Sequence, residues 1–134
     1  MAASLVAQMP ESDRAAAAAA LDAETARMEQ ALEGDDLLAW AAADERFHEL
    51  MTELSGNRRL DKVAGTVRDQ SHRARLYTLH LRRTPTESAR EHRRITTAIV
   101  TGDPAHAEAQ ARTHREGARN ALVPLLRQYG MKNL

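Results

Sequence analysis

The chain contains no cysteine, and only 3% of its residues are aromatic. Without thiols it can form neither disulfide bonds nor metal sites built on thiolate ligands. Valine, isoleucine, tyrosine and phenylalanine are scarce while alanine is abundant, which favours helices over strands. No apolar run approaches the roughly 20 residues of a transmembrane helix, and the N-terminus lacks a secretory signal pattern. These absences predict an all-α protein that is soluble in the cytoplasm.

An excess of either charge is also lacking, because 19 Lys and Arg residues balance 19 Asp and Glu residues. This balance argues against nucleic-acid binding through bulk electrostatics by the segment itself. The length of 134 residues suits one domain, residues 1–134, with enough buried surface for a core. We find no internal repeat and no linker.

Residues that favour turns and caps divide the chain into about six helices. The expected helical segments are 2–8, 12–32, 35–54, 57–81, 84–102 and 103–130. Asp35, Asn57, Thr84 and Asp103 are expected to cap helices, and Pro124 to kink or break the last one. The predicted fold is a single-domain antiparallel helix bundle.

The stretch 35–56 has an apolar stripe at helical spacing that contains two ionisable residues. Its apolar members are Leu37, Trp40, Ala41, Phe47, Met51 and Leu54. Asp44 and His48 lie within this stripe, four residues apart, on the side expected to face the core. Burying a carboxylate and an imidazole without compensation is costly. A bound metal ion is the best candidate for that compensation.

Two more histidines lie on the apolar stripes of later helices. His92 shares its stripe with Ile95 and Ile99, and His114 has mostly small neighbours that leave room around its imidazole. The histidines expected to be solvated are His72, His80 and His106. One Asp and three His would thus face inward from three helices, a set that suits zinc, nickel, cobalt, manganese or iron. The alternative is that each is an ordinary hydrogen-bonded core residue.

The fourth predicted helix has an unusually polar inward face. Its expected inward apolar residues are Leu60, Val63, Ala64, Val67, Ala74 and Leu81. Ser71 and Thr78 share this face, Gln70 and Arg75 flank it, and Arg73 points away. Arg75 could bind a ligand carboxylate while Gln70, Ser71 and Thr78 read hydroxyls. Alternatively, Arg75 is solvated and the others bond within their own helix; Tyr77 and Trp40 are expected in the core.

An ordered set of short motifs resembles a known family. The motifs are Asp44-x-x-Phe47-His48, Ser55-Gly56-Asn57, the segment 69–75, Glu91-His92, Ala98 with Gly102-Asp103, and His114. Together they resemble, over nearly the whole chain, the FCD domain, the C-terminal effector-binding domain of GntR-type bacterial transcription regulators of the FadR subgroup.

This resemblance implies an all-helical bundle with a central cavity that holds a divalent ion, commonly zinc or nickel. Motif matching assigns the ligands to Asp44, His48, His92 and His114. The resemblance further implies that the ion and nearby arginines bind small organic acids such as hydroxy or sugar acids; the arginines of segment 69–75 are Arg73 and Arg75. It implies a regulator whose DNA binding changes when the acid binds.

Members of this family also carry an N-terminal winged helix-turn-helix, which nothing in this sequence resembles. The segment is therefore expected to be either an excised domain or an FCD protein without its DNA-binding domain, and not to bind an operator by itself. DNA would be a partner only through that separate domain, a homodimer is expected, and no membrane partner is.

Two other functions are open on the sequence. A metalloenzyme would need a general base, either Glu45 or Glu91. Glu45-x-x-His48 resembles half of a di-iron motif whose second half is missing, and Thr52 stands where a zincin helix needs its second histidine. The alanine-rich second helix also fits a helical dimerisation module. We expect a sensor and not an enzyme.

Overall fold

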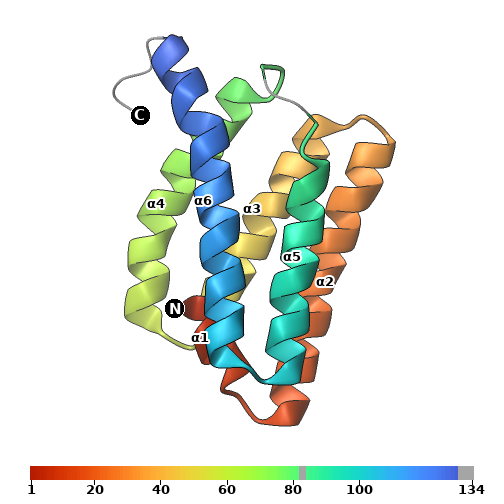
Figure 1. Ribbon diagram of the computed structural model, residues 1–134, viewed down its shortest axis with the longest axis vertical. Helices are drawn as coiled ribbons and strands as arrows, with labels where there is room; N and C mark the ends of the chain where they lie inside the picture. The colour runs from red at the N-terminus through yellow and green to blue at the C-terminus, as the bar shows by residue number, and fades with distance from the viewer. Residues whose placement is uncertain (82–83, 130–134) are drawn as a thin grey trace.

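The computed structural model describes residues 1–81 and 84–129, and these form six helices arranged as a bundle (Figure 1). The helices are α1 (Ala2–Ala7), α2 (Glu11–Glu33), α3 (Leu37–Leu54), α4 (Arg58–Thr78), α5 (Thr86–Thr101) and α6 (Pro104–Gln128). The predicted all-α bundle of about six helices is confirmed. Among the described helices, none is both long and apolar enough to cross a membrane.

Side chains fix where three of the helices begin. Asp36, Asn57 and Asp103 each accept a hydrogen bond from the backbone N–H three residues further on, at 2.9, 3.0 and 2.9 Å. Such caps satisfy donors that the first helical turn leaves free. Asn57 and Asp103 were predicted, but Asp35 was the wrong cap for α3. Asp35 instead adopts a positive φ of 52° directly after the C-cap Gly34.

The structure bears on two further expectations. Thr84 does not cap α5: the helix begins one residue after Pro85 without a side-chain cap, and the Thr84 carbonyl accepts a hydrogen bond from the Thr86 N–H at 2.9 Å. Of the kink or break expected at Pro124, the break is absent, because α6 continues to Gln128. Proline removes one backbone donor within a helix, and the rest of the ladder carries α6 past that position.

Two apolar clusters hold the bundle together. The larger joins α1, α2, α3, α5 and α6 around Phe47, Ile95 and Ile99, and the smaller joins α2 to α3 around Met28 and Trp40. Alanines of α2 take part in both, because a methyl side chain lets neighbouring helices approach closely. The packed helices therefore make a rigid frame for the side chains that α3, α5 and α6 direct inward.

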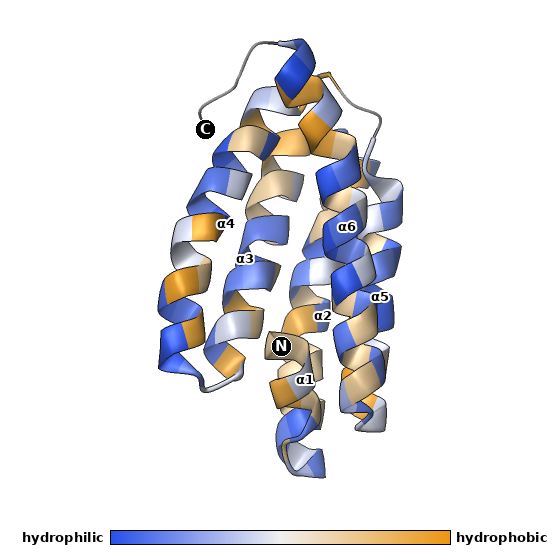
Figure 2. Cartoon of the chain, turned by 60° about the vertical axis from the view of Figure 1, so that its left-hand side comes forward, coloured by the Kyte–Doolittle hydropathy of each residue, from blue (hydrophilic) through white to orange (hydrophobic). Residues whose placement is uncertain are grey.

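Helix α4 lies at the margin of this frame, against α3 and more lightly against α6. Val63, Val67 and Tyr77 are 68%, 51% and 69% exposed, and Leu81 is also exposed, so these four were wrongly predicted to face inward. Figure 2 shows α4 at the left edge of the bundle, with hydrophobic residues in orange along it. The helix turns a polar side inward instead, because its arginines pair with carboxylates of α3.

Candidate metal centre

Four side chains from three helices converge inside the bundle. Asp44 and His48 come from α3, His92 from α5 and His114 from α6, and all four are buried. Each offers one ligand atom, and these atoms all lie within 4.8 Å of one another. We call this set the histidine–aspartate cluster. The four residues predicted from the sequence as ligands are thus brought together.

The three imidazoles approach one another through the same nitrogen. His114 Nε2 lies 3.1 Å from His92 Nε2 and 3.3 Å from His48 Nε2. Zinc bound about 2.0–2.1 Å from such nitrogens would place tetrahedral neighbours about 3.3 Å apart. Carboxylate oxygens of Asp44 lie 3.7 Å from His92 Nε2 and 3.8 Å from His48 Nε2. These spacings and this donor set fit a divalent ion.

The protonation state of the histidines also suits metal binding. Burial lowers the pKa of His48 well below 6.5, and the positive charge of Arg115 lowers it further. Burial, followed by the charge of His114, lowers the pKa of His92 in the same way. Both imidazoles are therefore neutral near pH 7, the form in which a histidine nitrogen can donate its lone pair to a metal.

Two contacts hold the imidazoles in place. The ring of Phe47 stacks on that of His92, with centroids 3.9 Å apart and an interplanar angle of 1°, and His92 is completely buried. His114 Nδ1 lies 2.7 Å from Glu91 Oε2. A carboxylate can only accept, so Nδ1 is the protonated nitrogen and Nε2 keeps its lone pair for the cluster.

Asp44 is shared between the cluster and an arginine. Arg75 Nη2 lies 2.9 Å from Asp44 Oδ2, but the pair lacks hydrogen-bond alignment, and Oδ2 is a buried atom with no hydrogen bond among the described residues. Ser88 Oγ donates to the other oxygen at 3.5 Å. The carboxylate therefore has lone pairs left for a cation while Arg75 balances part of its charge.

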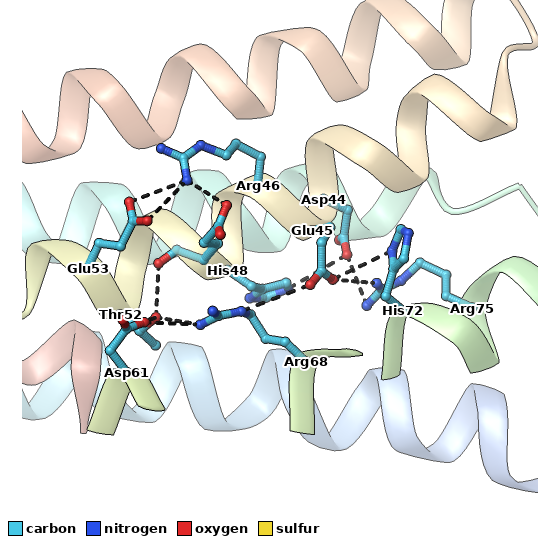
Figure 3. Close-up of polar contacts among 11 residues, drawn as sticks. Asp44, Glu45, Arg46, His48, Thr52, Glu53, Asp61, Arg68, His72 and Arg75 are labelled. Carbon is cyan, nitrogen blue, oxygen red and sulfur yellow. Dashed lines mark hydrogen bonds and ion pairs between the residues drawn. The ribbon is translucent and has the colours of Figure 1, made fainter. Parts of the chain in front are cut away.

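A chain of polar contacts continues this pairing along α3 and α4 (Figure 3). Glu45 lies 3.6 Å from both Arg75 Nη1 and His72 Nδ1, and 3.9 Å from Arg68 Nε. Burial raises the pKa of Glu45, and the charges of His72 and Arg75 oppose that shift. Arg68 also donates to Thr52 Oγ1 at 2.6 Å. These contacts fasten α4 to the helix that carries two of the cluster residues.

Three cavities border the cluster. The α1-side cavity, 350 Å³, lies among α1, α3, α4, α5 and α6, and the α4–α6 cavity, 280 Å³, includes Gln70 and Ser71. The α5-side cavity, 370 Å³, includes Asp44 and Ser88. His114 lines all three. The site is therefore reachable from several sides although its four side chains are buried.

The residues predicted to bind a ligand are placed differently from one another. Gln70, Ser71 and Arg75 line the α4–α6 cavity beside His48. Thr78 is fully buried and its hydroxyl bonds to backbone oxygens of its own helix, at 2.9 and 3.3 Å. Arg73 is exposed and lines none of the three cavities that border the cluster. Of the histidines expected to be solvated, His80 and His106 are exposed, whereas His72 is partly buried against Glu45.

The sequence did not identify two residues that lie beside the cluster, Glu91 and Arg115, as its partners. Glu91 was noted in the Glu91-His92 motif and as a possible general base, but not as a partner of His114, although its place directly before His92 could have suggested a role in holding an imidazole. Arg115 lines both the α1-side and the α4–α6 cavity. No pattern singled it out, because it follows His114 off the apolar stripe of α6.

The family comparison agrees with this architecture. The model of the FCD domain family matches residues 1–117, which include the whole cluster. No curated protein matches the chain, and no solved structure matches it either.

Proposed function

Because this chain belongs to the FCD domain family, the effector-binding domains of GntR-type transcription regulators, we propose that it senses a small organic acid through a divalent ion. The observation that carries the proposal is the approach of three Nε2 atoms to within 3.1–3.3 Å beside a buried carboxylate. Asp44, His48, His92 and His114 would be the ligands of the ion, with zinc or nickel the foremost candidates.

The ion would supply positive charge that draws a carboxylate into the bundle. Gln70, Ser71 and Arg75 support this from the wall of the α4–α6 cavity, where they can bind a carboxylate or hydroxyl. Hydroxy and sugar acids carry both groups. Effector binding would favour one conformation of the domain over another, and only that difference in affinity can alter DNA binding by a separate winged-helix domain. Such a regulator would act in the cytoplasm.

Catalysis is not part of the proposal, and the geometry gives a reason. The two candidate bases are both committed: Glu91 to His114 at 2.7 Å, and Glu45 to Arg75 and His72 at 3.6 Å. A general base needs to be within reach of a substrate proton and free to accept it. The family's regulatory role points the same way.

A homodimer is part of the proposal. Val63, Val67 and Tyr77 expose apolar surface along α4, and such surface on a soluble protein commonly marks an interface. Light scattering of the purified protein would measure its mass in solution, and a monomeric mass at high concentration would contradict the proposed homodimer.

Elemental analysis tests the metal centre directly. Protein purified without chelators should contain about one divalent ion per chain, and His92→Ala or His114→Ala should lose it. His106→Ala, which changes an exposed histidine, is the control and should keep it. Small hydroxy acids should then raise the melting temperature of the metal-loaded protein by mass action. Protein that takes up no ion would refute the proposal.

A further inference from the structure

We infer that Arg115 binds the carboxylate of the effector, at the point where the α4–α6 cavity and the α1-side cavity meet beside the cluster. The inference rests on the proposed function and names the side of the cluster from which the acid enters and the charged residue that receives it. Arg75, in this arrangement, serves mainly to balance Asp44.

The position of Arg115 is the first support. It lines both cavities, and the residues that these two cavities share are His48, His114 and Arg115. A molecule in either cavity therefore meets the guanidinium of Arg115 together with two of the candidate ligand imidazoles. Arg75 and Arg119 also line the α4–α6 cavity, and Arg112 the α1-side cavity, but Arg115 is the arginine common to both. α4 and α6, which flank the smaller cavity, touch only lightly.

The partners of the arginines at the site are the second support. Arg75 lies 2.9 Å from Asp44, and Arg68 bonds to Thr52 at 2.6 Å and contacts Asp61 at 3.4 Å. In the described part of the chain, Arg115 has no hydrogen bond and no ion pair to a protein group. Its five N–H donors are therefore available for a ligand, and a guanidinium suits a carboxylate because two parallel N–H···O bonds can form.

The electrostatic surroundings are the third support. The side chain of Arg115 is exposed, and the positive charges of Arg75 and Arg68 act on it together with the negative charges of Asp44 and Glu45. An arginine stays charged at neutral pH. A bound carboxylate would relieve the repulsion between Arg115 and the other two arginines.

The walls of the α4–α6 cavity limit the chemistry of the acid. Gln70 and Ser71 offer polar groups on α4, while Leu122, Val123 and Leu126 make one end apolar. The volume of 280 Å³ is near the lower limit for small-molecule sites. These features fit a 2-hydroxy acid with a short aliphatic chain, whose carboxylate lies near Arg115 and whose chain lies against the leucines and valine.

Titration calorimetry on the full chain tests the inference in two stages. The first measures zinc affinity of wild type, Arg115→Gln and Arg115→Lys; the second measures binding of lactate and of 2-hydroxy-4-methylpentanoate to each zinc-loaded protein. Arg115→Gln should weaken acid binding about tenfold to a hundredfold with zinc affinity unchanged or higher. Arg115→Lys should recover part of the loss, since lysine keeps the positive charge but cannot form two parallel hydrogen bonds to a carboxylate.

Arg94→Gln is the matched control, because Arg94 is exposed on α5, pairs with Glu87 at 3.0 Å and lines none of the three cavities bordering the cluster. It should leave both affinities unchanged. If Arg115→Gln binds the acids as wild type does, the inference is wrong and the proposed function stands. If zinc-loaded wild type binds neither acid, both fail, and if wild type binds no zinc, the metal centre itself fails.

A pair of space-filling variants identifies the cavity independently of charge. Ser71 lines the α4–α6 cavity only and Ala121 the α5-side cavity only. Ser71→Leu should reduce acid affinity at least tenfold, whereas Ala121→Leu should leave it unchanged. The reverse result would place the acid in the α5-side cavity and overturn the assignment of Arg115.

Discussion

His114 Nδ1 and Glu91 Oε2 lie 2.7 Å apart, the shortest contact that any histidine of the cluster makes with a carboxylate among the described residues. The pair joins α5 to α6 and determines which nitrogen of His114 faces the other imidazoles. A carboxylate partner of this kind orients a metal-binding histidine and raises its basicity. Glu91 is thus a positioning residue for the candidate metal centre.

Replacing this carboxylate should weaken metal binding. Glu91→Gln should reduce zinc affinity by about tenfold to a hundredfold, because the amide can present either its oxygen or its nitrogen to Nδ1 and no longer enforces one tautomer. A competition titration with a chromophoric chelator would measure the affinity. Glu53→Gln, at an exposed site beside Arg46, is the control, and an equal loss in both variants would contradict the role of Glu91.

Removing Arg75 should destabilise the metal-free protein. Asp44 is 2% exposed and Arg75 7% exposed, so Arg75→Met leaves a buried carboxylate without its partner, at a cost of about 3–5 kcal/mol. Urea unfolding in the presence of a chelator would measure the loss. The double variant Arg75→Met with Asp44→Asn should be less destabilised than the single one, because no uncompensated charge remains. Additive losses would show that the two residues do not interact.

The stability of the metal-free protein should fall as the solution is acidified. The pKa of His48 and that of His92 are lowered well below 6.5 by burial, so the unfolded chain binds more protons than the folded one below pH 6.5. Their contribution is fully present above that pH and is lost below it, by up to roughly 1.4 kcal/mol per pH unit for each imidazole.

Melting curves between pH 7.5 and about 5 in a chelator would measure this slope. His92→Gln should make it shallower, since the substituted side chain takes up no proton. His106→Gln, which changes an exposed side chain, should leave the slope unaltered. A metal-free protein whose stability does not change across this range would contradict the prediction.

The contacts in Figure 3 predict how α4 is held. Arg68 contacts Thr52, Asp61 and Glu45, so Arg68→Met should loosen α4 more than it alters the rest of the bundle. Hydrogen exchange should become faster in the backbone amides of α4 and remain nearly unchanged in α2 and α5. Arg73→Met, at an exposed site on the same helix, should not have this effect; uniform acceleration in both variants would refute the role of Arg68.

The sequence by itself determined the helices and the candidate ligands. Alanine content and helical spacing fixed the all-α class, and Asn57 and Asp103 marked helix starts correctly because a cap depends only on residues within one turn. Asp44, His48, His92 and His114 could be picked out because each lies on an apolar stripe, where a polar side chain is unexpected.

Only the tertiary structure decided how helices are rotated against one another and which side chains meet. The valines of α4 suggested one inward face, but ion pairs with α3 turned another face inward. Arg115 lies off the apolar stripe of its helix. Glu91 and His114 are far apart in sequence, and so are Arg115 and His48. Their proximity follows from the packing of separate helices, which periodicity within one helix cannot specify.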